Sequence, residues 1–375
     1  MRWISILAAG PLLGLATGCT TEAVLAPGPA SVGSENPAGR LPKMVLRDGE
    51  GRRYDALGRG RDGAGALIPL AGYNQFWFAW SVFNHDSAIF PEGRVDTGPL
   101  TGDGECAVPC DEIRLGCPGP DCIPALTAPS VVAAGDPAAA YLSPRAWVVG
   151  VAAGGEARAY PHNVLWWHEI VNDVVGGVPV AITHCPLTFS SIGHDPTAFT
   201  DGKTVALGVS GRLFNANLVF YSREDESWFS QLLGVGTRGT ALGVAAPRTH
   251  VWEMSWAAWR TLYPRTTVLT EDTGHARNYQ RYPYGDYFTD HDDTFSTLEP
   301  RADARYPAKT LTYGLRVGDG AKAYPHPELR TAAGGEASGI INDAIGSTPV
   351  AILYDLDAGF VQAFAREGHG ELRIE

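Results

Sequence analysis

Apolar and polar residues alternate along this chain in short blocks that are separated by glycine-rich turns. The blocks 148–151 and 157–160 flank the pair Gly154-Gly155, which predicts a β-hairpin. Apolar residues at helical spacing then predict a helix over 162–170. A further apolar block at 179–183, which begins with proline, predicts a buried strand. Together these elements predict a β-β-α-β unit.

The same residue pattern occurs twice. The sequence Ala-Arg-Ala-Tyr-Pro-His at 157–162 recurs as Ala-Lys-Ala-Tyr-Pro-His at 321–326, and 170–182 matches 340–352 at eight of thirteen positions. Two ordered matches of this kind indicate duplication of one supersecondary unit. We place the first repeat near 147–186 and the second near 311–356. The predicted fold class is α+β and predominantly β, with short-stranded sheets and a few short helices built around a duplicated β-β-α-β unit.

Other apolar blocks fit the same fold. Alternation predicts strands over Thr204–Ser210 and Asn217–Tyr221, and three tryptophans between 252 and 259 at helical spacing predict a core stripe. The aromatic run 76–83 is too short to span a bilayer. We expect it to be a buried strand or short helix, with an aromatic patch that contacts a membrane as the alternative.

Reactive residues distinguish the first repeat from the second. The first contains Trp-Trp-His-Glu at 166–169 and Thr-His-Cys-Pro at 183–186. The second has Ala-Ser-Gly at 337–339 and Leu-Tyr-Asp-Leu at 353–356 in these places. Residues that both repeats share are expected to be scaffold. We therefore infer one functional half and one supporting half.

The predicted elements restrict which of these side chains can act together. Period-two alternation places His184 and Cys185 on opposite faces of their strand. His168 and Glu169 diverge by about 100° around a helix. We therefore expect folding to pair Cys185 with either His168 or Glu169, and these three residues are the catalytic candidates.

Three interpretations of this set remain open. A Cys–His pair can generate a thiolate nucleophile, with a carboxylate that orients the histidine. Cys185, His168 and His184 can alternatively bind copper or zinc. The third interpretation is a buried, inert thiol with a structural histidine. The sequence contains no P-loop, no G-x-G-x-x-G and no G-x-S-x-G motif, so nucleotide chemistry and α/β-hydrolase chemistry have no support.

Composition limits the partners. The chain has 375 residues, 45 Gly, 27 Pro and a formal net charge of -12. A nucleic-acid surface needs clustered Lys and Arg, so we expect no nucleic-acid partner. The high content of Gly and Pro favours tight turns and short strands over long helices.

The N-terminus is typical of an exported lipoprotein. Residues 1–18 comprise Arg2, an apolar run and small residues that lead to Cys19, which resembles a bacterial lipobox. We predict a signal peptide over 1–18, a lipidated Cys19 carrying acyl chains such as palmitate, and a flexible tether over 19–42. The alternative is an ordinary cleaved signal peptide. The predicted location is the cell envelope, on the periplasmic side; Thr20 favours the outer membrane over the inner.

Four cysteines lie close together in an N-terminal segment over 43–135, which precedes the core at 136–375. They are Cys106, Cys110, Cys117 and Cys122. An exported chain favours two local disulfides over a zinc site, although three pairings remain open. Cys185 is then the one free thiol.

Several ordered motifs give the chain its resemblance to a bacterial family, domain-of-unknown-function family 3179. They are Gly-Pro-Asp-Cys-Ile-Pro-Ala-Leu at 119–126, Gly-Glu-Ala-Arg-Ala-Tyr-Pro at 155–161, Trp-His-Glu-Ile-Val-Asn-Asp at 167–173, Gly-Val-Ser-Gly at 208–211 with Asn-Ala-Asn-Leu at 215–218, and Ser-Gln-Leu-Leu-Gly at 230–234. The resemblance spans roughly 110–360 and implies a fold and an envelope context, without an established activity.

One position departs from the family pattern. In the family that this chain resembles, the motif at this position is Cys-Pro-Leu-Cys-Gly-Thr, whereas here Cys185-Pro186-Leu187 is followed by Thr188. The resemblance therefore implies that a dithiol–disulfide cycle within this motif is lost. A non-catalytic structural or interaction lipoprotein with a vestigial site is the alternative to a small-ligand or metal site.

Overall fold

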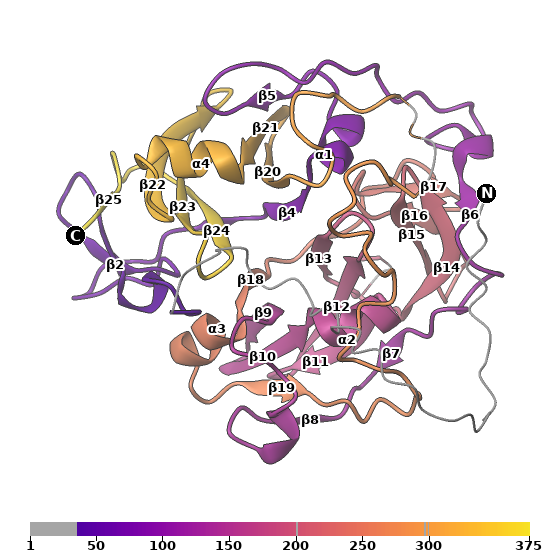
Figure 1. The fold of residues 1–375 in the computed structure, drawn as a ribbon, viewed down its shortest axis with the longest axis horizontal. Coiled ribbons are helices and arrows are strands. Elements are labelled where there is room, and N and C mark those ends of the chain that lie inside the picture. The colour runs from indigo at the N-terminus through magenta and orange to yellow at the C-terminus, as the bar shows by residue number, and fades with distance from the viewer. Residues whose placement is uncertain (1–35, 200–201, 296–297, 299) are drawn as a thin grey trace, which may run out of the picture.

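The computed structural model describes residues 36–199, 202–295, 298 and 300–375. The predicted signal peptide and Cys19 lie outside these residues, as does the tether up to position 35. Short strands dominate the fold, which confirms the predicted α+β, mainly β class (Figure 1). The α-helices of the described chain have seven residues each: α1 (Trp77–Phe83), α2 (His162–His168), α3 (Trp256–Leu262) and α4 (His326–Ala332). Within the described residues, no helix has the length and apolar character needed to cross a membrane.

Two sheets contain the first repeat. One has the strand order β18 (Trp252–Ser255), β9 (Trp147–Ala153), β10 (Glu156–Pro161), β19 (Thr267–Leu269) and β8 (Val131–Ala133). The other has the order β13 (Ser190–His194), β12 (Val178–Cys185), β11 (Ile170–Val175) and β7 (Leu126–Thr127). Helix α2 connects β10 of the first sheet to β11 of the second.

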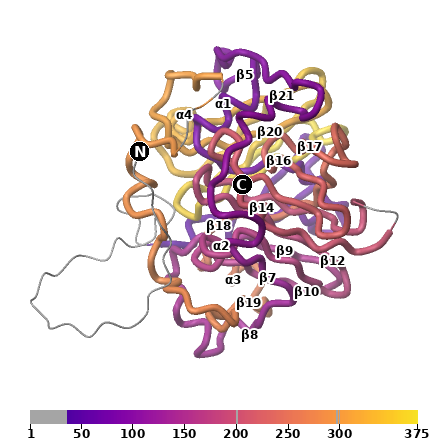
Figure 2. Tube along the Cα trace, turned by 90° about the vertical axis from the view of Figure 1, so that its right-hand side faces the viewer, coloured from indigo at the N-terminus to yellow at the C-terminus, as the bar shows by residue number. Residues whose placement is uncertain are grey.

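Two further sheets contain the second repeat. One has the order β4 (Tyr73–Phe76), β20 (Leu311–Val317), β21 (Gly320–Pro325) and β5 (Ala88–Ile89). The other has the order β22 (Ser338–Ile345), β23 (Thr348–Asp355), β24 (Phe360–Ala365) and β3 (Pro69–Leu70). Figures 1 and 2 place β20, β21 and β5 at one end of the molecule and β10, β19 and β8 at the other.

The remaining strands form two peripheral sheets. The larger has the order β17 (Val235–Arg238), β16 (Trp228–Ser230), β15 (Asn217–Ser222), β14 (Leu207–Phe214) and β6 (Arg114–Leu115). The smaller contains β2 (Arg53–Asp55), β1 (Val45–Arg47) and β25 (Arg373–Ile374). Three short 3₁₀ helices complete the described elements: η1 (Leu41–Lys43), η2 (Cys110–Glu112) and η3 (Pro137–Ala139).

Each half of the molecule receives a strand–helix–strand segment from another part of the chain. The segment β18–α3–β19 flanks the β9–β10 hairpin, and the segment β4–α1–β5 flanks the β20–β21 hairpin. The registers correspond, because Ser255 pairs with Trp147 as Phe76 pairs with Leu311. The element order does not test whether the halves arose by duplication, which stays a prediction.

The two flanking helices are anchored in the same way. The indole of Trp259 packs directly on Gly150 and donates a hydrogen bond to Thr266 Oγ1 at 2.8 Å. The indole of Trp80 packs on Gly314 and donates to Ser87 Oγ at 3.0 Å. A Cβ atom at either glycine would collide with the ring. The aromatic run 76–83 is thus buried, as predicted: Phe76 ends strand β4 and 77–83 forms helix α1.

One predicted helix end is wrong. The sequence pattern extends the helix to Ile170, but α2 ends at His168, and 170–175 forms β11. Antiparallel pairing with β12 satisfies the backbone of this β-branched segment, and tertiary pairing overrides the local helical pattern. Glu169 makes the sharp transition with φ +56°.

The cysteine-rich segment forms two local disulfides, as predicted. They join Cys106 to Cys110 and Cys117 to Cys122, and Cys185 is the free, buried thiol. Each of the six sheets contains at least one strand from 43–135. Strands β3, β4 and β5 join the sheets of the second half, β7 and β8 join those of the first half, and β1, β2 and β6 belong to the two peripheral sheets. The segment that carries the disulfides therefore packs directly on the core.

Candidate functional site

The ends of α2 and β12 bring Cys185 and Glu169 to the same place. Cys185 is the last residue of β12, and Glu169 is the C-cap of α2. The backbone carbonyl of Glu169 accepts a 2.7 Å hydrogen bond from the amide of His184, next to Cys185 in the chain. The Cys185 thiol points toward the β14–β15 turn, where it donates to the carbonyl of Ala216 at 3.6 Å.

Both reactive groups are buried and neutral at pH 7. Glu169 is 4 % exposed and Cys185 is 1 % exposed. Burial raises the pKa of Glu169 to about 8. Burial, with the neighbouring charge of Glu169, raises the pKa of Cys185 to about 11. The Glu169 carboxyl makes no side-chain hydrogen bond to the described part of the chain. The pair therefore consists of a thiol and an unpaired carboxylic acid.

His168 faces away from this pair. Its Nδ1 lies 2.8 Å from the carbonyl of Pro124, and its Nε2 lies 2.8 Å from the hydroxyl of Tyr279. Burial is the main cause that lowers its pKa to about 4, so the ring is neutral. Of the two predicted partners, folding brings Glu169 to Cys185 and turns His168 elsewhere, as their divergence around the helix end requires.

His184 also lies apart from Cys185, on the opposite face of β12 as the alternation predicts. Its Nδ1 lies 3.0 Å from Ser191 Oγ, and its ring centroid is 4.4 Å from that of His162. Cys185, His168 and His184 do not form a set of donor atoms within 4.8 Å of one another; in the described chain only Asp103, Cys106 and Cys110 do so. The residues therefore do not fit a copper or zinc ion at Cys185, and we derive no metal chemistry there.

A buried polar network supports the loop that follows Cys185. Asn217 Nδ2 donates to Thr188 Oγ1 at 3.0 Å and to Gln231 Oε1 at 2.8 Å. Ser190 Oγ donates to the same Gln231 oxygen at 2.8 Å. All four residues are at most 1 % exposed. Thr188, at the position that carries cysteine in the resembling proteins, thus has a structural partner in this chain.

Tyrosines from a distant segment cover the loop. We name residues 279–287 the tyrosine segment; it lies in the connection between β19 and β20 that runs along one side of the molecule (Figure 2). Tyr282 donates to the carbonyl of Pro186 at 3.1 Å, and Tyr287 donates to that of Leu187 at 2.8 Å. Sequence reasoning missed this segment, although four tyrosines in nine residues are a visible signal.

Left-handed backbone conformations cluster around Cys185. Glu169, Phe189, Asn215 and Ala216 have φ values of 56°, 55°, 50° and 59°. Asn adopts this region readily, but the other three residue types are strained there. Asn215 and Ala216 form the two-residue turn between β14 and β15, a hairpin geometry in which both residues have positive φ. Glu169 adopts its positive φ where the chain turns from α2 into β11.

A second buried cluster, which sequence reasoning also missed, joins the two halves. Glu253 accepts hydrogen bonds from His162 Nε2 at 3.0 Å, Ser191 Oγ at 2.8 Å and Asn74 Nδ2 at 2.9 Å. Asn74 Oδ1 in turn lies 2.9 Å from His326 Nε2. His162 of the first repeat thus bonds to Glu253, and the corresponding His326 of the second repeat bonds to Asn74. Burial raises the pKa of Glu253 to about 7.

Comparison with known proteins identifies one family. The family described as "Protein of unknown function (DUF3179)" matches residues 120–373, which is more than half of the chain. No curated protein and no solved structure matches. The matched region contains Cys185, Glu169, the polar network and the tyrosine segment.

Proposed function

The chain belongs to the DUF3179 family, and we propose that it is a lipid-anchored protein of the bacterial cell envelope that binds a small ligand at the Cys185–Glu169 site. One observation carries the ligand proposal. The Glu169 carboxyl is 4 % exposed and makes no side-chain hydrogen bond to the described chain. Its oxygens are not among the fully buried unpaired side-chain atoms of the described chain, so a ligand with a hydrogen-bond donor can reach them and supply the missing bond.

The chemistry of the site favours a ligand with hydrogen-bond donors. A primary amine or a small hydroxyl compound can donate to Glu169, and an ammonium group would also stabilise its ionised form. Burial, with the charges of Glu169 and Cys185 among the further causes, raises the pKa of the Tyr284 hydroxyl, so this hydroxyl lies near both groups. Aromatic faces and a carboxylate together suit a cationic ligand.

Binding is better supported than nucleophilic catalysis. A nucleophilic cysteine needs a lowered pKa or an adjacent base. Here burial and Glu169 raise the pKa of Cys185, and His168 is bonded to Pro124 and Tyr279. His168 acts instead as a positioning residue, because its 2.8 Å hydrogen bond with the Tyr279 hydroxyl fixes one end of the tyrosine segment.

Ligand binding can be tested by thermal shift at pH 7.5 with a panel of small amines and polyols. We expect at least one compound to stabilise the wild-type protein and to lose most of its effect in Glu169→Gln. Glu367→Gln, which changes an exposed carboxylate, is the matched control and should respond like wild type. Equal stabilisation of all three proteins, or of none, would refute the proposed site.

Lipid anchoring is tested separately through Cys19. The wild-type chain should incorporate labelled palmitate and sediment with outer-membrane vesicles after cell disruption. Cys19→Ser should lose the label and appear in the soluble periplasmic fraction, because a single cysteine carries the acyl chains. Unchanged sedimentation of Cys19→Ser would contradict the anchor.

A non-catalytic structural lipoprotein with a vestigial site is the second candidate. Its specific support is that Thr188 replaces the second cysteine of the resembling motif and is bonded into the scaffold through Asn217. This alternative requires that no ligand of the panel distinguishes wild type from Glu169→Gln.

A further inference from the structure

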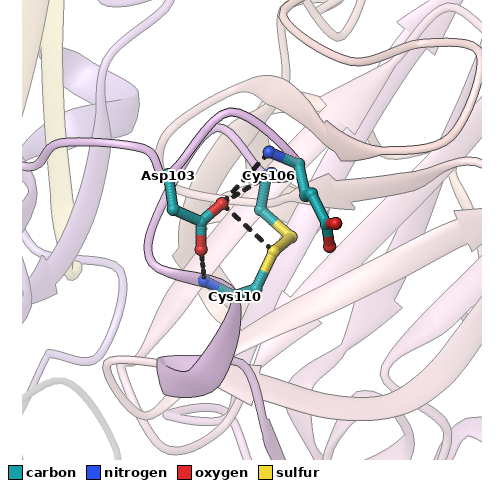
Figure 3. Close-up of a disulfide and its surroundings, with 4 residues drawn as sticks. Asp103, Cys106 and Cys110 are labelled. Atoms are coloured by element: carbon teal, nitrogen blue, oxygen red, sulfur yellow. Dashed lines mark hydrogen bonds between the residues drawn. A yellow bond between two sulfur atoms is a disulfide. The ribbon is translucent and has the colours of Figure 1, made fainter.

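The Cys106–Cys110 disulfide lies against the carboxylate of Asp103, a residue type that can bind metal ions. Figure 3 shows Asp103 facing the two cysteines from the same loop. One ligand atom from each of these three residues lies within 4.8 Å of the other two. The Asp103 Oδ1 atom is 3.3 Å from Cys110 Sγ.

Backbone amides hold Asp103 in place independently of the disulfide. The amides of Glu105 and Cys106 donate to Oδ1 at 3.2 and 3.0 Å, and the amide of Cys110 donates to Oδ2 at 2.7 Å. Each carboxylate oxygen has two lone-pair sites, so Oδ2 retains one for another partner.

The loop is fixed to the core by contacts that do not involve the sulfur–sulfur bond. Val108 is fully buried, and the amide of Ala107 donates to the carbonyl of Thr237 at 3.1 Å. Cys106 is 3 % exposed, whereas Cys110 is partly exposed. The loop can therefore keep its shape after reduction, and a reductant or an ion can reach the pair from the side of Cys110.

We propose that Asp103, Cys106 and Cys110 form a zinc site that the disulfide closes and reduction opens. A dithiol reductant of the thioredoxin class, or a phosphine in the laboratory, supplies two electrons, and the sulfur–sulfur bond breaks. Each cysteine sulfur takes one proton. A dithiol supplies both protons and becomes a disulfide, whereas with a phosphine one water molecule supplies both protons and the oxygen of the phosphine oxide. Zn²⁺ then displaces both thiol protons to solvent and binds the two thiolates and Asp103.

The donor set favours zinc. Two thiolates and a carboxylate carry three negative charges, and Zn²⁺ accepts both sulfur and oxygen ligands in tetrahedral sites. Copper(I) prefers soft ligands and would gain little from Asp103. Three protein ligands leave a fourth position for water. This proposal does not depend on the Cys185 site.

The second disulfide provides a matched control within the same segment. Asp121 precedes Cys122, but its carboxylate accepts hydrogen bonds from Tyr221 at 2.7 Å and from Arg223 at 2.6 Å. In the described chain no carboxylate oxygen lies beside both sulfur atoms of the Cys117–Cys122 pair as Asp103 lies beside those of Cys106 and Cys110, although the pair contributes the same number of thiols.

The experiment measures zinc bound by the full-length protein before and after reduction with a phosphine that is then removed anaerobically. We expect no zinc on the oxidised protein and one zinc per chain on the reduced protein, with two thiols protected from maleimide. The double variant Cys117→Ser/Cys122→Ser should retain this zinc, and Cys106→Ser/Cys110→Ser should lose it. Asp103→Asn keeps the shape of the side chain and should weaken binding at least tenfold.

Three results would overturn the proposal. They are zinc binding that is equal in the oxidised and reduced proteins, zinc retained by Cys106→Ser/Cys110→Ser, and zinc affinity unchanged in Asp103→Asn. Circular dichroism of the reduced wild type and of each variant shows that the fold is intact. If Asp103→Asn does not fold, Asp103→Glu tests the same donor: a retained carboxylate should bind zinc, and complete loss of zinc with an intact fold counts against the site.

Discussion

Replacing Glu169 by Gln should stabilise the protein, and the gain should grow as the pH rises. The substitution keeps the shape of the side chain but removes the ionisable carboxyl. Glu169 is 4 % exposed and its pKa rises from 4.5 to about 8 through burial. A carboxyl with a raised pKa in the folded state resists ionisation there, whereas the unfolded chain ionises freely above about pH 4.5.

The magnitude follows from this pKa difference. Below pH 4.5 the carboxyl is protonated in both states and costs nothing electrostatically. Between pH 4.5 and 8 only the unfolded state loses the proton, so the free energy of unfolding falls steadily. Above pH 8 the full penalty is present and amounts to about 5 kcal/mol. Relaxation around the ionised group makes this an upper bound.

Urea denaturation at pH 5 and pH 8.5 provides the assay. We expect Glu169→Gln to exceed the wild type by less than about 1 kcal/mol at pH 5 and by about 3–5 kcal/mol at pH 8.5. Glu367→Gln changes an exposed glutamate and should show no such divergence. A difference between Glu169→Gln and wild type that is the same at both pH values would refute the unpaired, buried carboxyl.

Three further outcomes are expected. Native Cys185, which is 1 % exposed with a pKa raised to about 11, should react with maleimide at least about 100-fold more slowly than the unfolded chain; an equal rate would exclude a covered thiol. Tyr287→Phe removes one hydrogen bond from the cover and should speed this labelling about fivefold, and an unchanged rate would show that the segment does not control access. Gly150→Ala should cost about 3 kcal/mol by urea denaturation because its Cβ would enter the Trp259 ring, whereas Gly135→Ala, in open space, should cost less than about 1 kcal/mol.

Local patterns in the sequence predicted the elements that depend on local contacts. The hairpin around Gly154-Gly155, the strand that ends at Cys185 and the opposite facing of His184 and Cys185 follow from spacing and alternation. Two local disulfides follow from four clustered cysteines in an exported chain, although the sequence left their pairing open. Cys185 and Glu169 were identified because the second repeat lacks them.

Long-range contacts are what the sequence could not supply. Nothing in local spacing shows that Tyr287 covers Leu187, 100 positions away, or that Asn74 meets Glu253. The strand at 170–175 was missed because its partner strand, and not its own periodicity, determines its conformation. His168 was wrongly expected at the site because the sequence does not show which way a side chain at a helix end points. That direction depends on the backbone turn that follows the helix.

The exchange of strand–helix–strand segments bears on how the chain can unfold. The segment 73–89 completes a sheet formed by residues after 310, and 252–269 completes one formed by residues before 162. The second half is therefore built from residues on both sides of the first half in the sequence, and Asn74 and Glu253 hold the two at their shared boundary. The Phe76–Leu311 and Ser255–Trp147 strand pairs each close a loop of more than 100 residues, which slows folding. Unfolding should then be one cooperative transition for the whole core, and a protein cut between the halves should keep its structure only while both pieces stay associated.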